Sequence, residues 1–203
     1  MVSKQAVTIA VVAIVMLVVG IGIGYGVAGT RVTTNIMPTP TQRVVEAVIR
    51  QVVQVGSWRL AVLDVKEATY IKTKTLLFDT WSYYQAPKGA KIVIIKLRIE
   101  NAGIESAYLP VPTELMPILV TNANKMYNNV YTYNLQYIHV VSKEIEEKAV
   151  EYNELNMLPK IDPGSYVEGD IMFLIPQTEK PTKLIFNCWQ SPFEPQTIVI
   201  KLS

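Results

Sequence analysis

The chain has 203 residues, with 19 basic and 17 acidic side chains, one His and one Cys. This length allows one ordinary domain with an appendage, or two very small domains, and the formal net charge of +2 argues against a strongly basic nucleic-acid binder. The single Cys188 excludes an internal disulfide and a thiolate zinc site, and the single His139 excludes multi-His metal centres. We therefore expect no metal, no cofactor and no nucleic-acid partner.

A long apolar segment dominates the N-terminus. Residues 6–28 contain no charged side chain, and roughly 20 apolar residues of helix cross the hydrocarbon core of a bilayer. Tyr25, near the end of the segment, suits the membrane interface. A cleaved signal peptide is the alternative, with Gly26 and Ala28 before the cleavage point, but its apolar core is usually only about 7–15 residues long. We predict a short tail over residues 1–5 and a transmembrane signal-anchor helix over residues 6–28.

The orientation and the packing face of this helix also follow from the sequence. Basic residues on its two sides nearly balance, so the orientation rests on the short tail before a large polar domain, which favours a C-terminal domain outside the cell. Gly20, Gly22, Gly24 and Gly26 form a small-xxx-small pattern twice, which lets two helices pack closely in lipid. Glycine is common in membrane helices, so the pattern is also compatible with a helix that has no partner.

A Thr- and Pro-rich segment, residues 29–43, follows the apolar run. Pro38 and Pro40 favour extended backbone, which predicts a semi-rigid stalk. Residues 44–55 then read VVEAVIRQVVQV, a run that fits either a helix or a first strand, although the valines of 52–55 favour a strand. Because the run precedes the main domain, it can also donate a strand to the sheet edge of a neighbouring copy.

Alternating apolar and polar residues indicate a series of strands after residue 56. The strongest alternations cover Trp58–Val62, Val93–Ile99, Val167–Ile175, Leu184–Cys188 and Ile198–Leu202. Turn residues separate these runs, and at Asn101-Ala102-Gly103 we expect Asn and Gly to supply a positive φ. The layout predicts an all-β fold, an antiparallel β-sandwich over residues 44–203.

One segment departs from the strand pattern. Residues Ser142–Leu155 are rich in helix formers and place Glu144 and Lys148 at helical spacing. We predict a short helix or helical loop inserted between strands. Glu144, Glu146 and Glu147 lack the spacing of a calcium-binding loop, so we interpret them as part of a solvated surface.

Four short pieces of sequence occur in an order typical of a known family. They are Gly56-Ser57-Trp58, Lys88-Gly89 before Ile92–Glu100, Asn101-Ala102-Gly103, and Leu158-Pro159 followed by Ile161–Gly169, Phe173 and Pro176. The chain resembles the telokin-like, immunoglobulin-like extracellular domains of unknown function found in bacterial and archaeal lipoproteins and membrane-anchored surface proteins. The resemblance covers about residues 52–186 and implies an immunoglobulin-like sandwich outside the cytoplasm, with no catalytic residue. In these pieces we expect Pro163 and Gly164 to form a turn and Gly169 to let a bulky neighbour cross its strand.

Aromatic side chains are the most suggestive candidates for a binding surface. Trp81, Tyr83 and Tyr84 fall in a predicted loop, and Tyr131 and Tyr133 belong to a later tyrosine-rich stretch. Tyrosine combines rigid contact area with a hydroxyl group, which suits a protein or glycan partner. The same residue type also suits half-buried strands, which is the alternative interpretation.

The remaining reactive side chains have structural interpretations. His139, on a predicted strand, lacks the companions of a catalytic triad or a copper site. Cys188 is predicted to be a buried small hydrophobe, with an intermolecular disulfide as the alternative if it is exposed. We therefore predict a membrane-anchored cell-surface binding or structural module that is not an enzyme. The alternatives are a self-assembling filament subunit, hence a homo-oligomer, and an accessory subunit of a larger membrane complex; the Ile-, Val- and Tyr-rich composition suggests an archaeal protein.

Overall fold

The computed structural model describes residues 43–75, 80–108, 117–156, 159–189 and 195–202. The predicted tail, anchor helix and stalk therefore lie outside the described residues, as do the four glycines of the anchor, except that the last residue of the predicted stalk, Arg43, begins strand β1. In the part of the chain that is described, no helix is long and apolar enough to cross a membrane.

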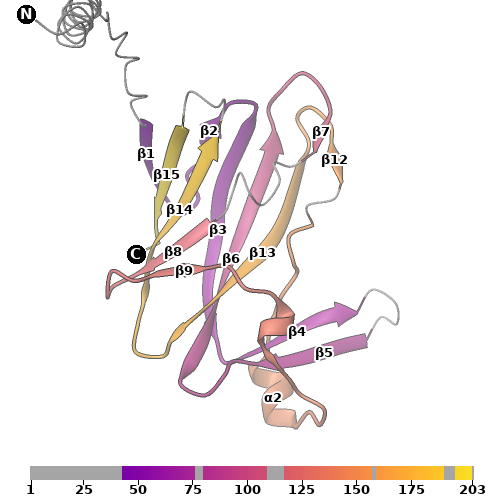
Figure 1. The fold of residues 1–203 in the computed structure, drawn as a ribbon. Helices are drawn as coiled ribbons and strands as arrows, with labels where there is room; N and C mark the ends of the chain where they lie inside the picture. Colours follow the sequence, from indigo (N-terminus) through magenta and orange to yellow (C-terminus); the bar gives the residue numbers. More distant parts are fainter. Residues whose placement is uncertain (1–42, 76–79, 109–116, 157–158, 190–194, 203) are drawn as a thin grey trace, which may run out of the picture. The chain divides into compact units, whose positions relative to one another are not determined.

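Two sheets form the β-sandwich (Figure 1). The first has five strands in the order β1 (Arg43–Val48), β15 (Pro195–Lys201), β14 (Pro181–Trp189), β8 (Pro117–Thr121) and β9 (Met126–Asn128). The second has four strands in the order β13 (Tyr166–Pro176), β6 (Ala90–Asn101), β3 (Trp58–Ala68) and β2 (Val53–Val55). Neighbouring strands are antiparallel except β1 and β15, which are parallel. The predicted all-β sandwich is confirmed.

The main core lies between these two sheets. Alternate residues of β6, among them Ile95 and Leu97, pack with Phe173 of β13 against Phe186 and Ile198 of the first sheet. All five are at most 2% exposed, and full burial of such a side chain contributes about 1.5–3 kcal/mol. The alternation seen in the sequence therefore corresponds to the inner face of each sheet.

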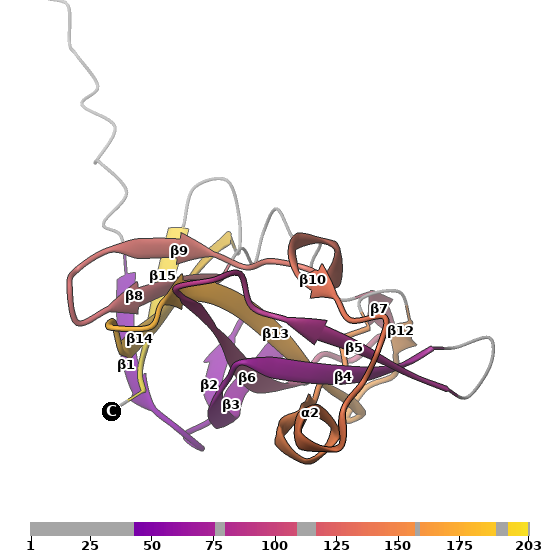
Figure 2. The ribbon, with the colours of Figure 1, turned by 90° about the horizontal axis from the view of Figure 1, so that it is seen from below.

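A smaller accessory sheet packs on the outer face of the second sheet. Its strands, in order, are β10 (Gln136–Tyr137), β5 (Thr80–Gln85), β4 (Tyr70–Thr75) and β11 (Val150–Glu151), and Figure 2 shows the β4–β5 hairpin extending away from the sandwich. Ile71 of this sheet joins Ile92, Ile94, Tyr152 and Met172 in a second core. Because this core buries the outward-facing Ile92 and Ile94, the first half of β6 is apolar on both faces.

The inserted helix is shorter than predicted. Helix α2 covers Lys143–Lys148 and begins at Ser142, whose Oγ accepts a hydrogen bond from the Ile145 amide (3.3 Å). The chain then becomes extended and pairs as β11 with β4. The helix prediction is therefore confirmed for the first half of residues 142–155 and wrong for the second. A 3₁₀ turn, η1 (Thr132–Asn134), and the short pair β7 (Ala107–Tyr108) and β12 (Lys160–Ile161) complete the elements.

The ambiguous run 44–55 forms strands rather than a helix. Strand β1 lies at the edge of the first sheet and β2 at the edge of the second, and Ala47 and Val53 are buried in the main core. The connection between them contains Arg50 in the left-handed region (φ 69°), with its amide bonded to the Val62 carbonyl (2.7 Å). The strand alternative is confirmed, and both strands have partners within their own chain.

Asn101 brings three of the four family-like sequence pieces together. Its Nδ2 donates to the carbonyls of Glu105 (2.7 Å) and Ile161 (2.9 Å), and its Oδ1 accepts from the Gly103 amide (2.9 Å). Its own carbonyl accepts from the Gly164 amide (2.7 Å). The next residue reaches the Gly56-Ser57-Trp58 piece, because the Ala102 amide donates to the Ser57 carbonyl (2.7 Å).

The turn chemistry predicted for these pieces is partly wrong. Neither Asn101 nor Gly103 has a positive φ, and Asn101 is fully buried. Gly103 is needed instead because a Cβ there would lie 3.0 Å from Asn101 Oδ1. Gly164 does have the expected left-handed backbone (φ +75°).

Candidate functional site

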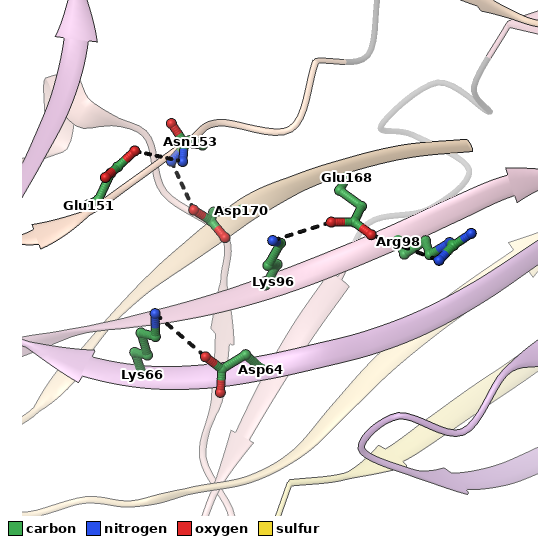
Figure 3. A network of polar contacts seen from close by, with 8 residues as sticks. All are labelled: Asp64, Lys66, Lys96, Arg98, Glu151, Asn153, Glu168 and Asp170. Atoms are coloured by element: carbon green, nitrogen blue, oxygen red, sulfur yellow. Dashed lines mark hydrogen bonds and ion pairs between the residues drawn. The ribbon is translucent and has the colours of Figure 1, made fainter. Parts of the chain in front are cut away.

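A polar hollow lies on the outer face of the second sheet (Figure 3). Its volume is about 340 Å³, and it is lined by Asp64, Lys66, Ile94, Lys96, Glu151, Asn153, Glu168, Gly169 and Asp170. This volume falls within the range of about 300–1,000 Å³ that is typical of small-molecule sites. We name this surface the polar hollow.

Strand register places the charged residues of the polar hollow in one row. Lys96 of β6 pairs with Asp64 on β3 and with Asp170 on β13. An irregularity in β3 between Val62 and Asp64 sets this register. Since neighbouring residues in register share one face of a sheet, the three side chains meet on the outer face.

Most of these charges already have partners. The Lys66 ammonium lies 3.6 Å from Asp64, and the Lys96 ammonium lies 3.2 Å from Glu168, which Arg98 also approaches at 4.0 Å. Such partly exposed ion pairs contribute about 0–1 kcal/mol each to stability. They fix the position of the side chains around the hollow more than they stabilise the fold.

Asp170 is the exception. It is only 8% exposed, and its Oδ2 accepts a hydrogen bond from the Asn153 amide (2.8 Å). Burial raises the pKa of the Asp170 carboxyl, although the Asn153 amide and the positive fields of Lys96 and Lys66 act in the opposite direction. Among the described residues, Asp170 Oδ1 has no hydrogen-bond or ion-pair partner, and because no buried side-chain oxygen there lacks a partner, Oδ1 is accessible to solvent.

Gly169 allows the wall of the polar hollow to lie against β13. The Leu155 amide donates to the Asp170 carbonyl (3.0 Å), and the Asp170 amide donates to the Asn153 carbonyl (2.6 Å). A Cβ on Gly169 would lie 2.8 Å from the Leu155 backbone nitrogen. The expectation that a bulky neighbour crosses the strand at this glycine is confirmed, and the neighbour is the Leu155 backbone.

Glu179 is a second buried carboxylate, with a different environment. It is 6% exposed and accepts hydrogen bonds from Lys125 (2.8 Å), Thr121 (2.7 Å) and Tyr127 (2.9 Å). These donors lower the pKa of Glu179 to about 2, and the hydrogen bond from Lys125 has the largest effect. Both of its oxygens are bonded, which is typical of a structural carboxylate, whereas Asp170 keeps one oxygen available.

The first group of predicted aromatic residues lies on a strand, so the predicted loop is wrong. Trp81, Tyr83 and Tyr84 belong to β5. Lys72 and Lys74 of β4 lie 5.2 and 5.6 Å from the centre of the Trp81 ring. Tyr83 is only 8% exposed and contributes to packing, and Tyr84 points to the opposite face, where it joins the second core.

The second group belongs to an exposed segment, residues 131–141, which we name the tyrosine segment. The rings of Tyr131 and Tyr133 stack at 5.5 Å, and Tyr133 is 79% exposed. Tyr137 makes edge-to-face contacts with Tyr84 (5.5 Å) and His139 (4.9 Å). Further apolar exposure on this segment comes from Tyr137 (48%), Val140 (85%) and Val141 (38%).

The structure gives the positions of the other candidate residues, but it does not describe the side chain of Cys188. His139 is exposed and follows β10 in a bend, so its predicted place on a strand is wrong. Cys188 lies in β14 opposite Gln196, and the burial predicted for its side chain lies outside what the structure describes. Glu144 pairs with Lys148 on helix α2 (2.7 Å). Within the described ranges, no group of three or more His, Cys, Asp or Glu side chains is placed to hold a metal ion.

Sequence reasoning did not identify the polar hollow. Lys96, Glu168 and Asp170 are visible in the sequence only as outward-facing members of alternating strands, and Glu151 falls in the predicted helical segment 142–155. The one available signal was Asp170, which lies between Gly169 and Ile171 in a strand that is otherwise apolar beyond that point. Recognising the site requires the strand register, which brings residues about 30 and 70 positions apart into one row.

Comparisons with known proteins give a family match but no activity. Residues 49–197 match the family described as "Domain of unknown function (DUF4352)", and no curated protein matches the chain. An uncharacterized beta-sandwich protein from Clostridium difficile 630 has a TM-score of 0.46 and 12% identity, over 78% of this chain and 95% of that one. The yjhA protein from Bacillus subtilis has a TM-score of 0.46 and 14% identity, over 77% of this chain and 99% of that one. The match agrees with the expected family of unknown function, and its telokin-like character stays a prediction.

Proposed function

This chain belongs to the DUF4352 family, and on that premise we propose that it is a non-catalytic binding module of the cell surface. In this proposal, residues 6–28 form a single-pass anchor in the cell membrane, and the immunoglobulin-like domain lies outside. The uncharged apolar run of residues 6–28 supports the anchor, and the confirmed β-sandwich supports a compact domain after it.

The tyrosine segment is the observation that carries the binding proposal. It exposes Tyr133, Tyr137 and Val140 within eight positions of one another, and exposed apolar groups gathered together mark interaction sites on soluble domains. Tyrosine loses little conformational entropy when it is buried against a partner, and its hydroxyl can still bond to water or to the partner. We propose a protein partner at the cell surface as the occupant of this segment.

The proposal predicts a measurable contribution from individual side chains. Interface tyrosines that act as anchors cost about 1–4 kcal/mol when they are truncated. Tyr133→Ser should therefore weaken the complex by about tenfold or more. Because the Tyr133 ring is mostly exposed and contacts Tyr131, its loss should leave the fold intact.

Site-specific photo-crosslinking in intact cells tests this function. A photoreactive amino acid is placed at Tyr133 or Val140, with Ile104 as the matched control because it is 95% exposed and lies outside the tyrosine segment. We expect a discrete adduct of higher mass at the first two positions and none at the control. Equal crosslinking at all three positions, or none at any of them, would contradict the proposal.

A second candidate function is self-assembly by strand exchange, and the position of β1 favours it. Strand β1 is the first described strand, lies at a sheet edge, and its parallel pairing with β15 can be reproduced between two copies. Val48 and Lys201 are directly paired, so Val48→Cys with Lys201→Cys, in a chain carrying Cys188→Ala, reports the pairing. Disulfide-linked dimers or ladders would support exchange, whereas a disulfide confined to single chains would exclude it.

A further inference from the structure

The polar hollow has a different lining from the exposed tyrosine segment, although Asp170 also lines a small adjoining pocket together with Tyr131. Asp170 lines the polar hollow and is only 8% exposed, with Oδ2 held by the Asn153 amide and Oδ1 without a donor among the described residues. Since no buried side-chain oxygen or nitrogen of the described residues lacks a hydrogen-bond partner, Oδ1 is the oxygen of Asp170 that stays accessible to a ligand. The fully bonded Glu179 shows that this fold can satisfy a buried carboxylate where it serves structure alone.

The charged residues around Asp170 restrict the classes of ligand that the polar hollow can bind. A cation would meet the ammonium groups of Lys66 and Lys96, whose positive fields already reach Asp170. An anion would meet the carboxylates of Asp64, Glu151 and Glu168. A ligand of either charge therefore meets lining groups of its own sign, whereas a neutral ligand does not.

Both donors and acceptors line the polar hollow. Acceptors are supplied by Asp170 Oδ1 and Glu151, and donors by Lys66, Lys96 and the Asn153 side chain. A hydroxyl group both donates and accepts, so a neutral molecule with several hydroxyl groups can satisfy neighbouring groups of both kinds. The volume of about 340 Å³ suits a ligand of the size of one sugar ring.

We propose that the polar hollow binds a neutral, hydroxyl-rich ligand of the sugar class, with Asp170 Oδ1 accepting a hydrogen bond from a ligand hydroxyl. Lys96, next to Asp170 in register, donates to a second ligand oxygen. Asn153 holds the carboxylate in place through its backbone amide. This site is independent of the protein partner proposed for the tyrosine segment.

Saturation-transfer NMR on the full-length chain in nanodiscs tests the proposal. The probes are glucose, galactose, mannose and N-acetylglucosamine, each as the free sugar and as a short oligosaccharide, and Ca²⁺ alone is titrated separately by isothermal titration calorimetry. We expect saturable binding of at least one sugar and no binding of Ca²⁺, and binding of Ca²⁺ without any sugar would overturn the proposal. Binding of the free sugar would show that the natural ligand is a small molecule. Binding of the oligosaccharide alone would show that the ligand is part of a glycan chain.

Four variants locate the binding. Asp170→Asn keeps an oxygen for the Asn153 amide but places a donor where the ligand needs an acceptor, so affinity should fall at least tenfold. Lys96→Met removes only a partly exposed ion pair, so it should fold and also weaken binding, while Asp162→Asn, a matched change at an exposed site, should not. No binding of any sugar, or binding that survives both hollow variants, would overturn the proposal. Binding lost only with Tyr133→Ser would assign the ligand to the tyrosine segment and would also overturn it.

Discussion

Replacing Asn101 with Ala would remove the side chain that connects residues 103–105 to Ile161. The change deletes the hydrogen bonds from Nδ2 to the carbonyls of Glu105 and Ile161 and the bond from the Gly103 amide to Oδ1. Asn101 is fully buried, so water does not readily replace these contacts. The smaller side chain also leaves a void beside Gly103, whose amide bonds to Asn101 Oδ1.

The expected loss follows from the number of bonds. Each net hydrogen bond contributes about 0.5–1.5 kcal/mol, and a partner left unsatisfied in the interior costs about 1–3 kcal/mol. Three lost bonds therefore lower the free energy of unfolding by about 1.5–4.5 kcal/mol. This is a large part of the stability of about 5–15 kcal/mol that is typical of a domain.

Urea unfolding of the full-length chain in detergent, followed by tryptophan fluorescence, measures this loss. Asn122→Ala is the matched control, because Asn122 Oδ1 accepts one exposed hydrogen bond from the Lys180 amide (2.9 Å); it should cost less than about 1 kcal/mol. If Asn101→Ala costs no more than Asn122→Ala, the role assigned to Asn101 is refuted.

Three other changes test separate parts of the account. Gly169→Ala should lower the free energy of unfolding by about 3 kcal/mol, because the new Cβ would collide with the Leu155 backbone and part it from β13; a loss under about 1 kcal/mol in urea would contradict this. Because the pKa of Glu179 lies near 2 in the folded state, below its ordinary value of 4.5, its stabilising effect is complete above about pH 4.5 and is lost as the pH falls through about 2. Thermal melts should therefore show less acid-induced loss in Glu179→Gln than in the unmodified chain, and parallel pH profiles would count against this role. Gly22→Ile with Gly26→Ile should release the protein from a larger membrane complex on native gels, whereas unchanged co-migration would eliminate the accessory-subunit hypothesis.

The sequence predicts the strands of the sandwich best where one face meets the core. In β13, Val167, Ile171 and Phe173 alternate with outward residues and pack inward as expected. Alternation does not predict strand β5, because its aromatic residues lie on both faces of the sheet. Trp81 and Tyr83 lie on one face and Tyr84 on the other, so no apolar–polar alternation is visible.

The polar hollow could not be predicted for a different reason. Asp64, Lys96 and Asp170 form one row only through the pairing of three strands, and an irregularity in β3 sets their alignment. Single-sequence patterns show the face on which a residue lies but not its neighbours across strands. Likewise, Asn101 and Gly103 were identified as turn residues, while the tertiary hydrogen bonds of Asn101 became evident only with the fold.

The central claim is that residues 6–28 hold a binding domain outside the cell, and labelling by a membrane-impermeant maleimide tests it most directly. Cysteine is placed at Ile104, which is 95% exposed, or at Lys4 in the predicted inner tail, each in a chain carrying Cys188→Ala. The account predicts that intact cells label Ile104→Cys, that Lys4→Cys is labelled only after lysis, and that both chains stay in the membrane fraction. Labelling of Ile104→Cys only after lysis would contradict the account.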